Sequence, residues 1–164
     1  MAMRRVWKEG VMAGLLGAAG VALWFFAVDL ISGRPLATPA ALGKGTFSVL
    51  GKGIDWGPTQ YVLGYTIIHV AAFVLLGLLV SWIVESSKRT PGVLAGLLIL
   101  FAVFEVGFYF LTLFLAQPET FGRIAWYQIG AANLVAAGLM GWYLWREHPE
   151  LTARFGRALV GESS

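Results

Sequence analysis

The stretch that decides the fold is YTIIHVAAFVLLGLLVSWIV, residues 65–84, an almost entirely apolar run that is interrupted by His69. A helix of about 20 mostly apolar residues is long enough to cross the hydrocarbon core of a bilayer. A second run, LFAVFEVGFYFLTLF at residues 100–114, encloses Glu105 in the same way. An ionisable side chain at such a depth is expensive and needs a partner, so these two residues are the first candidates for a functional role.

The composition of the chain is that of a membrane protein. Of its 164 residues, 58% are hydrophobic and only 13% are charged, and the mean hydropathy is +0.74. A soluble domain of this length has about 25% charged residues and could not bury so much apolar surface in one core. The sequence contains no cysteine, which excludes disulfides and thiolate chemistry. The net charge of +3 is small and no dense basic patch occurs, so we expect no nucleic-acid partner.

Four stretches are long and apolar enough to span a membrane, at about residues 10–31, 60–84, 91–116 and 123–144. We expect them to be helices, because lipid offers no partner to an unpaired backbone group. The sequence therefore predicts one all-α integral membrane domain over residues 1–164, an antiparallel bundle of four transmembrane helices. We expect the first span to be retained, because its apolar run is too long for a cleaved signal peptide.

The lysine and arginine residues predict the orientation, because cytoplasmic loops carry an excess of them. One side of the membrane would carry Arg4, Arg5, Lys8, Lys88, Arg89, Arg146, Arg154 and Arg157. The other side would carry Arg34, Lys44, Lys52 and Arg123. The sequence thus predicts a multi-pass protein of the cell inner membrane with both termini in the cytoplasm.

A long outer loop is expected at residues 32–59, between the first and second spans. Residues 39–42 either begin a short interfacial helix or belong to a flexible cap over the bundle. Lys44 and Lys52, each flanked by glycine, are suited to lipid headgroups or another anionic ligand. The cytoplasmic tail, residues 145–164, either lies on the inner membrane surface or forms a short solvated helix.

Small residues spaced three or four apart predict where the helices pack closely, because lipid tails remove the hydrophobic drive between helices. The predicted contact positions are Gly10, Gly14, Gly17, Gly20, Gly92, Gly96, Ala137 and Gly141. We favour contacts within one chain over contacts between chains. A homodimer or a larger membrane complex stays open as an alternative.

Three predicted spans bring a polar residue to the same depth. Counted inward from the outer ends, His69, Glu105 and Asn133 each lie roughly 15 Å deep, near the midplane of the bilayer. Helical spacing and position place further polar residues outward of them, so a polar lane would lead from the outer surface to the midplane. The candidate ligand-binding or proton-binding residues are His69, Glu105, Asn133, Tyr65, Tyr109 and Asp29.

Three interpretations of this midplane cluster stay open. The residues form a hydrogen-bonded network that braces the helices, bind a proton or a small amphipathic ligand, or await a partner subunit. One histidine with one glutamate and one asparagine is a thin ligand set, so we expect no metal site. We expect no haem either, because His148 is predicted to lie outside the bundle at the inner surface.

The exit of the first span, LWFFAVDLISGRPLATPAALG at residues 23–43, resembles a stretch of small uncharacterised bacterial four-span inner-membrane proteins. The resemblance covers most of the chain, and its motifs are not specific. It implies a bacterial integral membrane protein with polar residues inside the spans. It implies no catalytic residue.

The sequence therefore favours a non-enzymatic, polytopic membrane protein with an accessory or structural role, braced by its midplane polar cluster. The first alternative is a small binding or transport protein that uses His69, Glu105 and Asn133. The second is an intramembrane enzyme, which the lack of a nucleophile paired with a base disfavours. We expect no cofactor, and the expected partner is the lipid bilayer.

Overall fold

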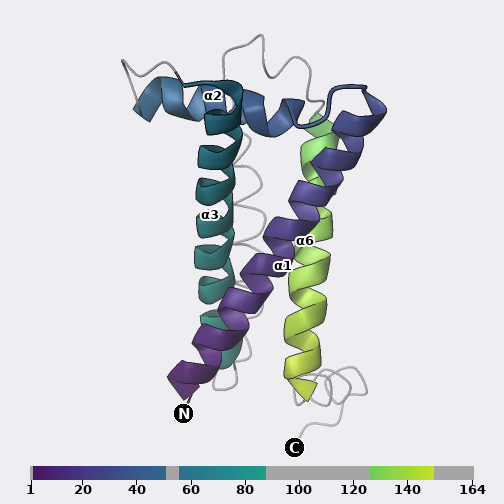
Figure 1. Ribbon diagram of the computed structural model, residues 1–164. Helices are drawn as coiled ribbons and strands as arrows, with labels where there is room; N and C mark the ends of the chain where they lie inside the picture. Colours follow the sequence, from purple (N-terminus) through teal and green to yellow (C-terminus); the bar gives the residue numbers. More distant parts are fainter. Residues whose placement is uncertain (1, 51–55, 88–125, 150–164) are drawn as a thin grey trace, which may run out of the picture.

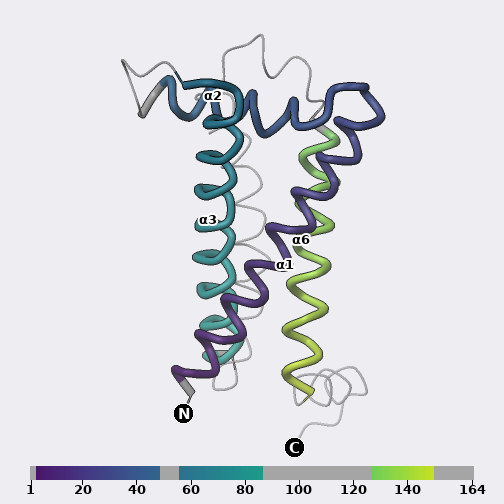
Figure 2. Tube along the Cα trace, in the orientation of Figure 1, coloured from purple at the N-terminus to yellow at the C-terminus, as the bar shows by residue number. Residues whose placement is uncertain are grey.

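The computed structural model describes residues 2–50, 56–87 and 126–149, and the secondary structure in these ranges is helical. The helices are α1 (Ala2–Ile31), α2 (Ala37–Leu50), α3 (Pro58–Ser87) and α6 (Trp126–Glu147). In Figure 1, α1 runs diagonally between α3 and α6, and α2 lies across the end of the bundle opposite the N-terminus. The tube in Figure 2 shows the sharp corner at which α1 passes into α2.

Two of these helices are long and apolar enough to cross a membrane, Met3–Ile31 and Pro58–Ser86. They contain the predicted spans 10–31 and 60–84. The α1 helix starts earlier than the predicted span, because the charged residues before Gly10 belong to the same helix. The α6 helix covers most of the predicted span 123–144. The predicted span 91–116 lies outside the described residues.

The corner between α1 and α2 is set by glycine and by hydrogen bonds. Gly33 adopts a left-handed φ of 68°. The N–H of Gly33 donates to the carbonyl of Leu30, and that of Arg34 donates to the carbonyl of Asp29. This pair of bonds is the Schellman arrangement that ends helices at a glycine. The chain is thereby turned so that α2 starts beside the last turn of α1.

The α2 helix occupies the middle of the predicted outer loop and is packed against α3. A Cβ on Gly43 would collide with the backbone carbonyl of Tyr61. Farther along α2, the ring of Phe47 stacks on Trp56, with centroids 4.7 Å apart. The Phe47 ring also fills the space beside Gly64, where a Cβ would lie 2.5 Å from its Cε2 atom. The structure therefore has the helix that was one of the two interpretations for this segment.

The tightest packing is between α1 and α3, where glycines from both helices meet. A Cβ on Gly10 would lie 2.6 Å from the Cα of Leu78, and one on Gly77 would lie 2.8 Å from the Cα of Gly14. Both distances are far below ordinary van der Waals contact. The two backbones touch because neither helix places a side chain between them, which confirms the predicted role of Gly10 and Gly14.

The α1 helix packs on α6 along its other side. A Cβ on Gly17 would lie 2.7 Å from the sulfur of Met140, and one on Gly20 would lie 2.7 Å from Leu139. Buried residues from three helices form the core beside these contacts: Ala13, Val21, Val84, Ala132, Ala136, Met140 and Leu144. Residue numbers rise along α1 as they fall along α3 and α6, so α1 is antiparallel to both.

The prediction of close packing at Gly141 on α6 was wrong for the described residues. A Cβ on Gly141 would meet nothing within 4 Å, and the same is true of Gly138. The reason is helix rotation, since the α6 face toward α1 carries Ala132, Ala136 and Met140 instead.

The outward faces of the bundle are apolar. Ile67 and Leu75 on α3 and Leu134 on α6 are 71%, 67% and 66% exposed. Large apolar side chains are thus exposed on both helices. Hydrocarbon is the surrounding that suits these faces.

Candidate functional site

The only ionisable side chain in the predicted second span, apart from tyrosine, is His69, and the structure places it against α1. Its Nε2 atom lies 3.2 Å from the backbone carbonyl of Ala18. That carbonyl accepts, so the ring is in the form that carries a proton on Nε2. This hydrogen bond links the middle of α3 to the middle of α1. It lies about two helical turns before Gly77 along α3.

Aromatic rings flank His69 along α3. The Tyr65 ring is stacked on it at 5.6 Å between centroids, and the Phe73 ring is tilted against it at 4.8 Å. These residues are four apart, so they lie on the same helix face. Tyr65 therefore lies one turn before His69 on the same face of α3, as the spacing predicted. His69 and Tyr65 are both half-buried.

The other predicted midplane residues are not joined to His69 in the described part of the chain. Asn133 is half-buried on α6, and no hydrogen bond connects it to His69 among residues 2–50, 56–87 and 126–149. Glu105 and Tyr109 lie outside the described residues. Of the four candidate residues that the structure describes, it brings together Tyr65 and His69.

Asp29 lies near the C-terminal end of α1 and is buried there. One carboxylate oxygen accepts from the backbone N–H of Thr38 at 2.8 Å, and the other accepts from the Thr38 hydroxyl at 2.7 Å. A helix begins with backbone N–H groups that lack partners, and its N-terminus favours negative charge. Asp29 therefore caps α2 from outside that helix, and both of its oxygens are occupied.

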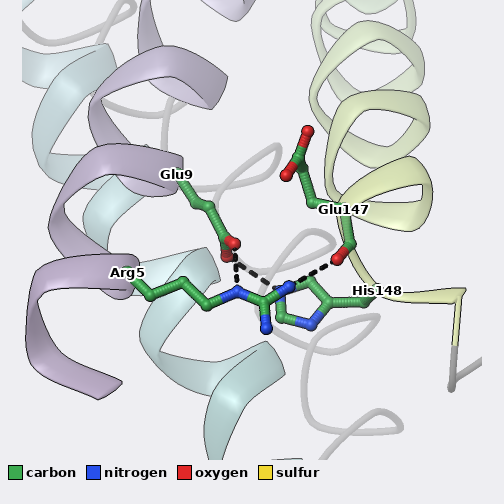
Figure 3. A network of polar contacts seen from close by, with 4 residues as sticks. All are labelled: Arg5, Glu9, Glu147 and His148. Atoms are coloured by element: carbon green, nitrogen blue, oxygen red, sulfur yellow. Dashed lines mark hydrogen bonds and ion pairs between the residues drawn. The ribbon is translucent and has the colours of Figure 1, made fainter. Parts of the chain in front are cut away.

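The sequence did not predict a polar network at the opposite end of the bundle, shown in Figure 3. The Nε atom of Arg5 donates to one Glu9 carboxylate oxygen at 2.6 Å, and Nε2 of His148 lies 2.8 Å from the other. Arg5 also donates to the backbone carbonyl of Glu147 at 2.5 Å. This network joins the first turns of α1 to the end of α6.

His148 corrects a prediction. It was expected outside the bundle at the inner surface, but its exposed fraction is 0%, and that of Glu9 is 3%. Burying a carboxylate is costly unless it is paired and hydrogen-bonded, and Arg5 and His148 provide both partners. The four-residue spacing of Arg5 and Glu9 was a signal for half of the network. No local signal points from Glu9 to His148, because 139 residues separate them.

Two further observations bear on chemistry. Among the described residues, no group of three histidine, aspartate or glutamate side chains is placed to hold a metal ion. Toward the C-terminal end of α1, the indole N–H of Trp24 donates to the side-chain oxygen of Gln128 at 3.0 Å, which links α1 to α6. The contacts of His69, Glu9 and Trp24 share one feature: in each, a polar side chain joins one helix to another.

The chain was compared with known proteins in three ways. No family model, no curated relative and no solved structure matches it. The resemblance of residues 23–43 to small four-span membrane proteins stays a prediction.

Proposed function

We propose that this chain is a four-span protein of the bacterial inner membrane, with both termini in the cytoplasm, and that it acts as a non-enzymatic accessory or structural component. The two long apolar helices, Met3–Ile31 and Pro58–Ser86, support membrane insertion. The apolar outward faces of α3 and α6 suit contact with lipid. The predicted span 91–116 would complete the bundle.

The observation that carries a structural role is the contact of His69 with the Ala18 carbonyl. A histidine that serves a ligand or a proton pathway would offer its ring to a cavity. Here the ring is bonded to the backbone of the neighbouring helix at 3.2 Å and is packed between Tyr65 and Phe73. Interhelical hydrogen bonds of this kind set which faces of two helices meet, although each contributes only about 0.6 kcal/mol on average.

The polar contacts at the two ends of the described bundle support the same role. Asp29 holds α2 against α1, and the Arg5–Glu9–His148 network holds α6 against α1. Each of these polar side chains connects two helices. In the proposed role, the buried polar groups hold the helices together in one bundle. A larger assembly would contain that bundle as a component.

The test compares two substitutions of His69. His69→Leu removes the hydrogen bond to Ala18 and should lower the free energy of unfolding in detergent by about 0.5–1.5 kcal/mol. His69→Gln keeps a side-chain N–H donor and should recover part of that loss. Both proteins, and the unmodified chain, are purified from native membranes in mild detergent and weighed by native mass spectrometry.

A structural role predicts that neither substitution changes the set of bound molecules. Copurifying proteins would identify the assembly in which the chain serves. The binding alternative would instead be supported by a small molecule of defined mass that is lost in His69→Leu while the stability stays unchanged. That result would contradict the bracing role of His69.

A further inference from the structure

The position of α2 differs from that of the other described helices. It lies across the ends of α1 and α3, whereas those two helices run along the bundle (Figure 1). If α1 and α3 cross the membrane, as proposed above, α2 lies in the plane of its surface. This orientation is typical of helices that sit at the boundary between headgroups and hydrocarbon.

The height of α2 is fixed at both of its ends. Asp29 binds its first turn through the backbone and hydroxyl of Thr38. Phe47 anchors its last turns by stacking on Trp56. Tryptophan is enriched at the level of the headgroups, so Trp56 marks the same level.

The exposed surface of α2 and of the corner before it carries positive charge. Lys44 is exposed on α2, and Arg34 is exposed at the corner before it. Asp29 is the only carboxylate among the described residues of this end, and both of its oxygens are bonded to Thr38. Within the described ranges, neither Lys44 nor Arg34 forms an ion pair. The surface would therefore attract a negatively charged ligand.

Exposed apolar side chains flank Arg34 at the corner between α1 and α2. Leu30, Ile31 and Leu36 are 51%, 89% and 45% exposed. Leu36 has a φ of 66°, a left-handed conformation that a residue with a side chain rarely adopts. In water these exposed apolar side chains would stay unburied. The edge of the hydrocarbon layer would bury the three side chains beneath the cations.

We infer that α2 and the preceding corner form a docking surface for anionic phospholipids, in which Lys44 and Arg34 bind the headgroup phosphates and Leu30, Ile31 and Leu36 enter the acyl-chain region. This inference rests on the proposed membrane-spanning role. It assigns α2 a preference for phosphatidylglycerol over phosphatidylcholine, because a zwitterionic headgroup offers no net negative charge to the two cations.

The experiment uses the full chain with a cysteine at Ser48, which is exposed one turn after Lys44. The native sequence has no cysteine, so a fluorophore attaches at this residue alone. The labelled protein is reconstituted into phosphatidylcholine vesicles that contain a small fraction of nitroxide lipid. The nitroxide is at carbon 5 of the acyl chain, and the probe lipid is either phosphatidylglycerol or phosphatidylcholine. The ratio of the two quenching efficiencies reports how strongly the anionic lipid is enriched beside α2.

We expect phosphatidylglycerol to be enriched beside α2, and Lys44→Gln and Arg34→Gln to lower the enrichment by about fivefold each, because a basic residue at an anionic surface contributes about 1 kcal/mol. The control, Arg4→Gln with Lys8→Gln, removes two positive charges from the other end of α1 and should leave the ratio unchanged. Equal quenching by the two lipids in the unsubstituted chain, or an equal loss in the control, would overturn the lipid site.

An alkaline carbonate wash of the same vesicles separates this inference from the proposed function. Protein that stays in the vesicles and shows no lipid preference overturns the docking surface alone. Protein that the wash extracts overturns the membrane-spanning role as well. Quenching that 10 mM inorganic phosphate abolishes at constant ionic strength would show that the cations select a free anion, and would also overturn the lipid site.

Discussion

Gly77 is the position at which one added methyl group should disturb the bundle most. In Gly77→Ala the new Cβ would lie 2.8 Å from the Cα of Gly14 and 2.5 Å from its backbone nitrogen. It would also collide with the carbonyl oxygen of Gly10. All three atoms belong to the α1 backbone, so no side-chain rotation relieves the collision.

The size of the effect follows from these distances. Carbon atoms in contact prefer a separation of at least about 3.5 Å, so α1 and α3 must part by about 0.7 Å at this point. If the helices part along their length, the contact of His69 with the Ala18 carbonyl grows from 3.2 Å to about 3.9 Å, which is too long for a hydrogen bond. Overpacking costs about 1–3 kcal/mol and the lost bond about 0.6 kcal/mol, so we expect a destabilisation of about 2–4 kcal/mol.

The measurement is reversible unfolding in mixed micelles, followed by far-ultraviolet circular dichroism. Gly138→Ala is the matched control, because among the described residues a Cβ there meets nothing within 4 Å. That substitution should leave the stability unchanged or raise it by up to about 1 kcal/mol through helix propensity. If Gly77→Ala unfolds at the same denaturant fraction as Gly138→Ala, the close crossing of α1 and α3 is not present in the protein.

Two further substitutions test the ends of the bundle. Asp29→Ala removes both hydrogen bonds to Thr38 and should destabilise the start of α2 by about 0.5–2 kcal/mol; amide hydrogen exchange over α2 should then rise, and unchanged exchange would refute the capping role. Glu9→Gln removes the charge that pairs with Arg5 and His148 and should lower the free energy of unfolding by about 1–3 kcal/mol. Its control is Glu147→Gln, because Arg5 bonds the backbone carbonyl of Glu147 rather than its carboxylate. Equal effects of the two substitutions would refute the pairing of the Glu9 carboxylate with Arg5 and His148.

The long helices were predictable from the sequence because their signal is local. The lengths of the apolar runs predicted α1 and α3, and the four-residue spacing of Gly10 and Gly14 predicted one side of their contact. Gly77, the other side of that contact, carried no such signal. The other glycine of α3, Gly64, is thirteen residues away, so no close glycine spacing marks Gly77, and its importance comes from the helix that crosses it.

The polar contacts were predictable only in part, because they depend on how each helix is rotated. The position of His69 showed that it needed a partner, but spacing within α3 does not show that the partner is a backbone carbonyl of α1. Asp29 was assigned to a polar lane, and the structure shows it capping α2. The contact between Glu9 and His148 joins residues near opposite ends of the chain, and sequence spacing carries no information about it.

The central claim, a bundle that crosses the membrane with α2 outside and both termini inside, is tested most directly by cysteine accessibility in intact cells. A single cysteine is placed at Ser48 on α2 in one variant and at Ser87, the last residue of α3, in another. The native chain contributes no background, because it has no cysteine. The account predicts that a membrane-impermeant maleimide labels the cysteine at residue 48 in intact cells and labels the one at residue 87 only after the membrane is permeabilised. Labelling of residue 87 but not residue 48 in intact cells would contradict the orientation, and labelling of both would contradict the crossing of α3.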